Sequence, residues 1–252
     1  MKQKSAFSAL FGLFVFGASH AVVQAETRYC LTGPVANGED VPLRLLRVRE
    51  SEPRTHFVAD HDPSRPNCPG PGDACKRRGF LLPDDVVIAG PEINGYNCVT
   101  YIAPDVKKVK GKIAETNGFL PAGALSIVPL PPPKPGDWIG TWTRIEEGEI
   151  TIKALAGGKL RVDGEATFGA RDPERVKRGA VNLGSLEGEA MPRGNTIALG
   201  DGYDGTKNPL SLDKGGECLA RLRLYGRYLV VEDNLGCGGM NVSFIGVYVR
   251  LK

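Results

Sequence analysis

The C-terminal stretch from Cys218 to Arg250 constrains the fold more than any other part of the chain. Apolar side chains recur there at every second position: Ala220, Leu222 and Leu224, then Tyr228 and Val230, then Val242, Phe244 and Tyr248. A period of two is typical of strands with one buried face. Glycines separate the three runs, where turns need positive φ angles. The stretch therefore predicts three consecutive antiparallel strands.

The N-terminus has the pattern of a secretory signal peptide. Lys2 and Lys4 precede an apolar run at 6–18, and small residues follow up to Ala25. The run is shorter than the roughly 20 residues that a membrane-spanning helix needs. A lipid-attachment cysteine follows a small residue, whereas Cys30 follows Tyr29. We expect residues 1–25 to be removed and the protein to be soluble and periplasmic or secreted.

All six cysteines lie after this segment, and an even number in an exported chain predicts disulfides. Cys218 and Cys237 would tie the ends of the C-terminal meander together. Among the other four, the sequence allows three pairings. The prolines and glycines between Cys68 and Cys75 bend the chain back, which favours that pair and leaves Cys30 with Cys98.

The overall charge makes two classes of main partner less favoured. Without Lys2 and Lys4 the chain carries 30 basic against 29 acidic residues, a balance that argues against nucleic acid or an anionic membrane. Two basic runs, Lys76-Arg77-Arg78 and Lys107–Lys112, fall on predicted loops. If both lie on one side of the domain, they form a local patch for an acidic polymer or glycan.

A proline-rich run at 129–135 divides the chain, because such a sequence favours an extended, semi-rigid spacer. We expect one domain at 26–128 and a second at 136–252. Short alternating runs and glycine-rich turns predict an all-β protein. The second domain contains eight predicted strands, which suit an up-and-down barrel: 138–144, 149–155, 159–168, 180–190, 196–201, 218–225, 228–233 and 242–251.

The end of the first domain resembles the closing signature of bacterial SH3-like domains, with the matching residues Gly118, Phe119, Leu120, Pro121, Ala122 and Leu125. The resemblance covers about 50 residues, 80–128, and departs from the commonest pattern by having Phe119 where tryptophan is usual. It implies a small barrel that binds peptides or cell-wall material. The binding residues expected there are Phe119, Tyr96, Tyr101, Lys76, Arg77 and Arg78. The alternative is a barrel without a ligand, serving as a spacer or an intramolecular partner.

The second domain opens with Gly136-Asp-Trp138, which resembles the start of lipocalin-like barrels. In that family a late arginine packs over the tryptophan, and this implies Arg250 over Trp138, with Trp142 as the second choice. A guanidinium over an indole stabilises by about 1–2 kcal/mol when desolvated. The segment 233–248 is also similar to the ends of uncharacterised exported proteobacterial proteins.

No motif predicts catalysis, a cofactor or a metal. His56 and His61 lie in a loop-like segment without the spacing of a metal pair. A G-x-S-x-G motif is absent, and the even cysteine count leaves no free thiol for a nucleophile. Gly200–Gly205 and Glu146–Glu149 could hold calcium or act as paired carboxylates, but both fit polar turns between strands.

These observations predict a non-enzymatic, monomeric exported protein that binds cell-envelope material or a protein partner. A narrower hypothesis is inhibition of a lytic enzyme such as lysozyme, based on the segment 244–248. The alternative is a small-molecule carrier that uses the barrel interior. It ranks second because five bulky side chains are expected to fill that interior: Leu222, Leu224, Val230, Phe244 and Tyr248.

Overall fold

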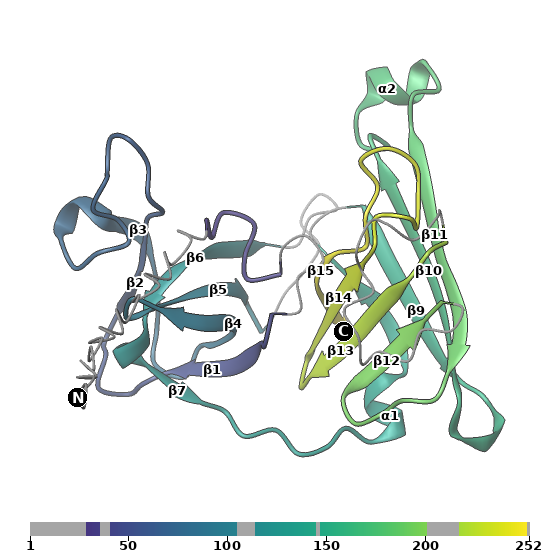
Figure 1. The fold of residues 1–252 in the computed structure, drawn as a ribbon, viewed down its shortest axis with the longest axis horizontal. Helices are drawn as coiled ribbons and strands as arrows, with labels where there is room; N and C mark the ends of the chain where they lie inside the picture. Colours follow the sequence, from purple (N-terminus) through teal and green to yellow (C-terminus); the bar gives the residue numbers. More distant parts are fainter. Residues whose placement is uncertain (1–28, 36–40, 105–113, 145–146, 201–216, 251–252) are drawn as a thin grey trace, which may run out of the picture.

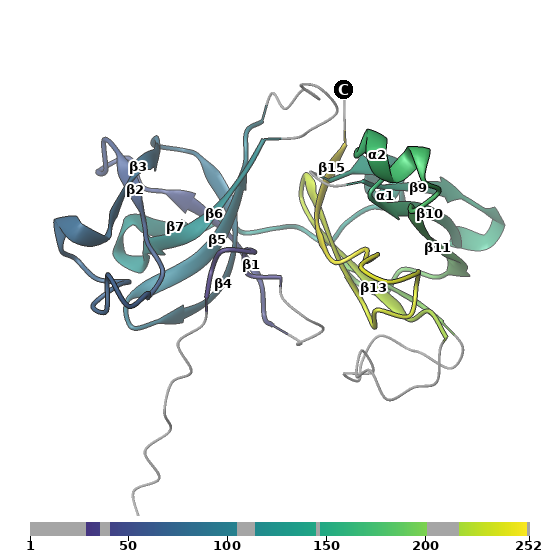
Figure 2. The same ribbon diagram turned by 90° about the horizontal axis from the view of Figure 1, so that it is seen from above.

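A computed structural model describes residues 29–35, 41–104, 114–144, 147–200 and 217–250. The predicted signal peptide, the second basic run and nearly all of the glycine-rich turn at 200–205 lie outside these ranges. Within them the protein is all-β and consists of two antiparallel sheets that lie side by side (Figure 1 and Figure 2). None of the helices in the described ranges has the length and apolar character of a membrane-spanning segment.

The first sheet has seven strands in the order β3-β2-β6-β5-β4-β1-β7. Their bounds are β1 Arg44–Val48, β2 Thr55–Val58, β3 Lys76–Leu81, β4 Val86–Ile93, β5 Tyr96–Ile102, β6 Glu115–Pro121 and β7 Leu125–Ile127. Two 3₁₀ turns, η1 (Asp73–Cys75) and η2 (Ala122–Ala124), precede β3 and β7. Phe57, Leu81, Val99 and Leu120 belong to its apolar core.

A second apolar cluster lies on the other face of β2 and contains both disulfides of this domain. Cys30 is bonded to Cys98, and Cys68 to Cys75, which are the favoured pairs. Val58 and Phe119 pack against these sulfurs. Alternation along β2 explains the two clusters, because Phe57 and Val58 point to opposite faces.

The second sheet is a nearly closed barrel of eight strands in the order β11-β10-β9-β8-β15-β14-β13-β12. The bounds are β8 Gly140–Thr143, β9 Gly148–Ala154, β10 Leu160–Phe168, β11 Asn182–Ala190, β12 Thr196–Leu199, β13 Ala220–Tyr225, β14 Tyr228–Asp233 and β15 Gly246–Arg250. The eight predicted strands all appear, and Cys218 is bonded to Cys237 as expected. The edge strands β11 and β12 approach at Gly188, where an added Cβ would lie 2.9 Å from Leu199 Cδ2.

Several boundaries differ from the prediction. The strand expected from residue 138 begins at Gly140, because Pro135–Trp138 forms a short helix, α1. A second short helix, α2 (Pro173–Lys177), lies between β10 and β11, and the 3₁₀ turn η3 (Ala156–Gly158) joins β9 to β10. The strand expected from Val242 begins at Gly246, since residues 242–245 form a loop held by Asp233.

Side chains fill the barrel interior. Trp138, Trp142, Phe244 and Tyr248 are almost wholly buried in one apolar cluster with residues from β9 to β14. Gly164 on β10 shows how tight the packing is, because an added Cβ would lie 3.0 Å from Phe244 and 3.1 Å from Leu186. A core at this density leaves little space for a ligand.

One predicted interior residue lies outside the barrel. Val230 and its neighbour Tyr228 pack against the first domain, and Leu229 and Val231 point into the barrel instead. All six residues of β14 are buried, so both of its faces carry apolar side chains. Period-two alternation cannot tell the two faces apart when both are covered.

The contact between the domains is apolar at its centre and polar at its rim. Leu45 and Ile88 of the first domain pack against Tyr228, Val230 and Val249 of the second. The Tyr228 hydroxyl donates to the Val86 carbonyl over 3.0 Å, and Arg227 Nη2 donates to the Ala103 carbonyl over 2.7 Å. The proline-rich segment therefore joins two domains that touch, rather than holding them apart.

Arg250 stacks on a different tryptophan from the favoured one. The Arg250 guanidinium carbon lies 4.7 Å from the ring centroid of Trp142. Trp142 is the direct cross-strand partner of Arg250, whereas Trp138 lies in α1, before the strand. Trp138 contributes its carbonyl, which accepts the Trp142 indole N–H over 2.9 Å, and Arg250 Nη2 donates to the Asp137 carbonyl over 2.6 Å.

Candidate functional site

The candidate site is a groove of about 600 Å³ on the outer face of the first sheet. Its floor is the face of β2 that carries His56 and Val58. One wall is the disulfide loop at 70–73, and the other is the turn from Pro121 to Ala124. The groove is lined by charged side chains and by rings, among them Glu52, Arg54, Asp73, Lys76, Tyr96 and Pro121.

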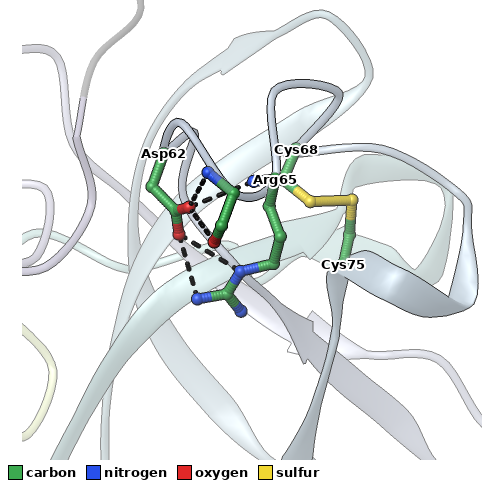
Figure 3. A network of polar contacts seen from close by, with 5 residues as sticks. Asp62, Arg65, Cys68 and Cys75 are labelled. Carbon is green, nitrogen blue, oxygen red and sulfur yellow. Dashed lines mark hydrogen bonds and ion pairs between the residues drawn. A yellow bond between two sulfur atoms is a disulfide. The ribbon is translucent and has the colours of Figure 1, made fainter.

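The loop at 70–73 that forms one wall of the groove is closed by the Cys68–Cys75 disulfide. Figure 3 shows Asp62 and Arg65 at its base, beside the Cys68–Cys75 bond. Asp62 accepts hydrogen bonds from the Ser64 hydroxyl and from the backbone amides of Ser64 and Arg65. The hydrogen bond from the Ser64 hydroxyl is the main reason why the pKa of Asp62 lies below its ordinary value of 3.8. The charged carboxylate therefore holds the turn at 62–65, which leads into the disulfide loop, at neutral pH.

Ring stacking fixes the cationic side of the groove. The Arg54 guanidinium lies 4.7 Å from the Phe80 ring centroid, and the His56 ring lies 5.4 Å from the same ring. His56 Nδ1 is 3.0 Å from the Arg77 carbonyl oxygen, so β2 and β3 are also joined by this side chain. Arg54 and His56 thus share Phe80 as a contact at the groove. Arg54 lies just before β2 and His56 lies within it, two positions apart in the sequence.

The groove brings together two of the six residues expected to bind. Tyr96, at the start of β5, and Lys76, at the start of β3, both line it. Phe119 is wrong as a contact residue, because only 3% of it is exposed and it packs on the disulfide cluster. A central position in β6 with apolar neighbours on both sides buries it.

The other three expected binding residues lie elsewhere. Tyr101, near the far end of β5, donates to Asp85 Oδ1 over 2.9 Å, and burial followed by this hydrogen bond raises the pKa of its hydroxyl. Arg77 donates to the Asn117 carbonyl over 2.6 Å and lies 5.9 Å from the Phe57 ring. Arg78 is exposed on β3 but does not line the groove.

The histidines and carboxylates weighed for chemistry are engaged in local structure. His61 Nδ1 lies 3.0 Å from the Pro66 carbonyl oxygen, away from the Arg77 carbonyl that His56 contacts. In the described parts of the chain, no three residues of the metal-ligating types lie close enough to hold a metal ion. Glu147 accepts from Thr167 Oγ1 and from the amides of Ala170 and Arg171.

The pKa of Glu147 follows from this geometry. Burial is the largest influence and would raise the pKa, but the hydrogen bonds from Thr167, Arg171 and Ala170 together outweigh burial and lower it. Glu147 is therefore ionised at neutral pH and fastens the segment after β10. Such a carboxylate fits a structural role better than that of a general acid, which needs a raised pKa.

Comparisons with protein-family models, with curated proteins and with solved structures found no match for this chain. The function must therefore be argued from the groove and the surfaces of the molecule.

Proposed function

We propose that this is an exported, non-catalytic binding protein that recognises an extended segment of cell-envelope material or of a protein partner. The observation that carries the proposal is the groove of about 600 Å³, which is open and lined by side chains of both charges beside an aromatic ring. Tyr96 supplies apolar area at a small cost in conformational entropy. Arg54, Lys76, Glu52 and Asp73 supply charged groups that orient a polar chain.

The SH3-like character of the first domain belongs to this proposal. The signature at 118–125 supports it, since β6 and η2 bring Pro121 and Ala124 to the groove. The seven-stranded sheet is larger than the minimal domain that the signature implies. Recognition through an exposed face of a small sheet needs no cofactor and no conformational change.

The carrier alternative is weaker because buried side chains, among them Trp138, Phe244 and Tyr248, occupy the barrel interior. The narrower hypothesis of lysozyme inhibition also loses its original basis. Phe244 and Tyr248 are fully buried in the barrel, so they cannot contact an enzyme. Inhibition would have to use the groove instead.

Retention of the purified protein on isolated cell-wall sacculi and on immobilised lysozyme tests the proposal. We expect retention on one of the two and at least a tenfold weaker affinity after Tyr96→Ala, because alanine removes the ring from the groove. Tyr29→Ala is the matched control, since Tyr29 is 64% exposed and does not line the groove. Lys76→Gln, compared with Lys153→Gln on β9, tests the charged wall in the same way.

Two results would contradict the proposal. One is no retention on either material. The other is an equal loss of affinity in Tyr96→Ala and Tyr29→Ala, because the groove would then have no special part in binding.

A further inference from the structure

One end of the barrel exposes large apolar side chains that come from four elements. Phe168 ends β10, Val176 lies in α2, Leu183 is the second residue of β11, and Met240 lies in the loop before β15. Their exposed fractions are 37%, 52%, 68% and 79%. In Figure 1 this is the end marked by α2, which projects beyond the rest of the barrel. We call these four residues and the cations around them the barrel-tip patch.

Hydrogen bonds hold the segments of the patch against one another. The Gly239 amide donates to the Leu183 carbonyl over 2.9 Å, and Asn182 Nδ2 donates to the Met240 carbonyl over 2.5 Å. The Cys237 carbonyl accepts from the Ser185 amide, and Cys237 is itself disulfide-bonded. Met240 is thus displayed to solvent by a fixed loop.

The segment between β10 and β11 carries more cations than anions. Residues 169–181 contain the basic residues Arg171, Arg175, Lys177 and Arg178 and the acidic residues Asp172 and Glu174. The two acidic residues lie at the start of α2, where Asp172 accepts from the amides of Glu174 and Arg175. Glu147 adds a third carboxylate, whose Oε1 lies 3.9 Å from Arg171 Nε. The Arg175 guanidinium lies 4.6 Å from the Phe168 ring centroid, so one cation is fixed at the base of the projection.

We propose that the barrel-tip patch binds the surface of an anionic lipid membrane. Projecting apolar side chains enter the boundary between headgroups and acyl chains, and adjacent Lys and Arg side chains meet the lipid phosphates. Salt screens the attraction between the protein and the lipid phosphates, so only charges within about 8 Å of the membrane contribute to it. The near-neutral charge of the whole chain therefore does not oppose binding through the barrel-tip patch.

Binding to vesicles tests the proposal, using the protein purified without residues 1–25. We expect it to sediment with vesicles that contain phosphatidylglycerol and only weakly with pure phosphatidylcholine. Raising the salt from 0.15 to 0.5 M lowers the binding, because the Debye length shortens. Lys177→Gln with Arg178→Gln lowers the partition coefficient about 25-fold, at roughly fivefold for each cation removed.

Two further double variants separate the contribution of the apolar side chains to membrane binding from that of the cations. Leu183→Ser with Met240→Ser lowers binding to the anionic vesicles while the salt dependence stays, since only the inserted apolar area is lost. Lys153→Gln with Lys159→Gln is the matched control, because both lysines are exposed at the opposite end of the β9–β10 hairpin. That control binds like the parent protein, and the near-ultraviolet circular dichroism of every variant checks the fold.

Three outcomes would overturn the proposal. They are no sedimentation of the parent protein with anionic vesicles, equal binding to both lipid compositions, and an equal loss in the control pair. None of these bears on the groove of the first domain, so the proposed function is tested separately.

Discussion

Asp233 shows how one side chain can hold an entire loop of the barrel. Its carboxylate accepts the amide of Leu235 over 2.8 Å and the amide of Phe244 over 2.5 Å, with the Ser243 hydroxyl at 3.3 Å. It is 1% exposed. Burial raises its pKa above 3.8, against the lowering effect of these hydrogen bonds and of Arg144. The loop is therefore held by a carboxyl group whose ionisation is opposed by burial.

The raised pKa of Asp233 predicts how stability depends on pH. The native state binds the proton more tightly than the unfolded state, so this group's contribution is fully present below pH 3.8. It is lost as the pH rises through the raised value. Urea unfolding between pH 3 and pH 7 should show this downward slope, and Asp233→Asn should lack it. In Asp84→Asn, a control at a site whose side chain is 63% exposed, the slope should persist.

Asp233→Asn should also lower the free energy of unfolding by about 1–3 kcal/mol at pH 7, since an amide cannot accept all three hydrogen bonds. A stability equal to that of the parent protein at pH 7 would contradict the role given to this carboxylate.

At the scale of the elements, the barrel depends on its last disulfide and on close packing between strands. The bond between Cys218 and Cys237 joins the segment just before β13 to the loop after β14, over a sequence separation of 19. Gly164 on β10 lies where Phe244, Leu186 and Ile150 leave no space for a Cβ. The disulfide lowers the conformational entropy of the unfolded chain. The close packing limits which side chains fit at position 164.

Replacing Cys218 and Cys237 together by serine should lower the free energy of unfolding by about 3 kcal/mol, because the unfolded chain gains loop entropy. Chemical denaturation of the parent and the variant measures the difference. If the midpoint does not change, the bond adds nothing to the stability of the barrel.

Gly164→Ala should destabilise the barrel by about 1–3 kcal/mol through overpacking. Gly136→Ala in α1 is the matched control, because no atom lies within 4 Å of its added Cβ. The melting temperatures of the two variants are compared by thermal unfolding. Equal melting temperatures would show that the barrel interior can accommodate an added methyl group at position 164.

At the scale of the whole molecule, the two sheets share a buried contact and so form one body. The outer face of β14, with Tyr228 and Val230, packs on Leu45 and Ile88. Three guanidinium or hydroxyl groups of the second domain, from Arg223, Arg227 and Tyr228, donate to carbonyls of the first. The groove and the barrel-tip patch are therefore held at a set distance from each other.

This contact predicts one cooperative unfolding transition for both domains. Val230→Asp places a charge in the buried contact and should split the transition into two in calorimetry, with the domains unfolding separately. Val176→Asp, at an exposed site, should leave the transition single. A single transition in Val230→Asp would mean that the contact does not couple the domains.

The sequence by itself determined the local features. Alternation and glycine turns predicted all eight strands of the barrel, because these signals act over short stretches of chain. The short segment between Cys68 and Cys75 likewise favoured their bond, which left Cys30 to pair with Cys98 over a sequence separation of 68. Only the tertiary structure decided which face of β14 enters the barrel, which tryptophan meets Arg250, and that Phe119 is buried. The groove likewise needs Arg54, just before β2, to meet Lys76 of β3 and Tyr96 of β5. Each of these depends on which segments pack together across long sequence separations, and no local pattern encodes that choice.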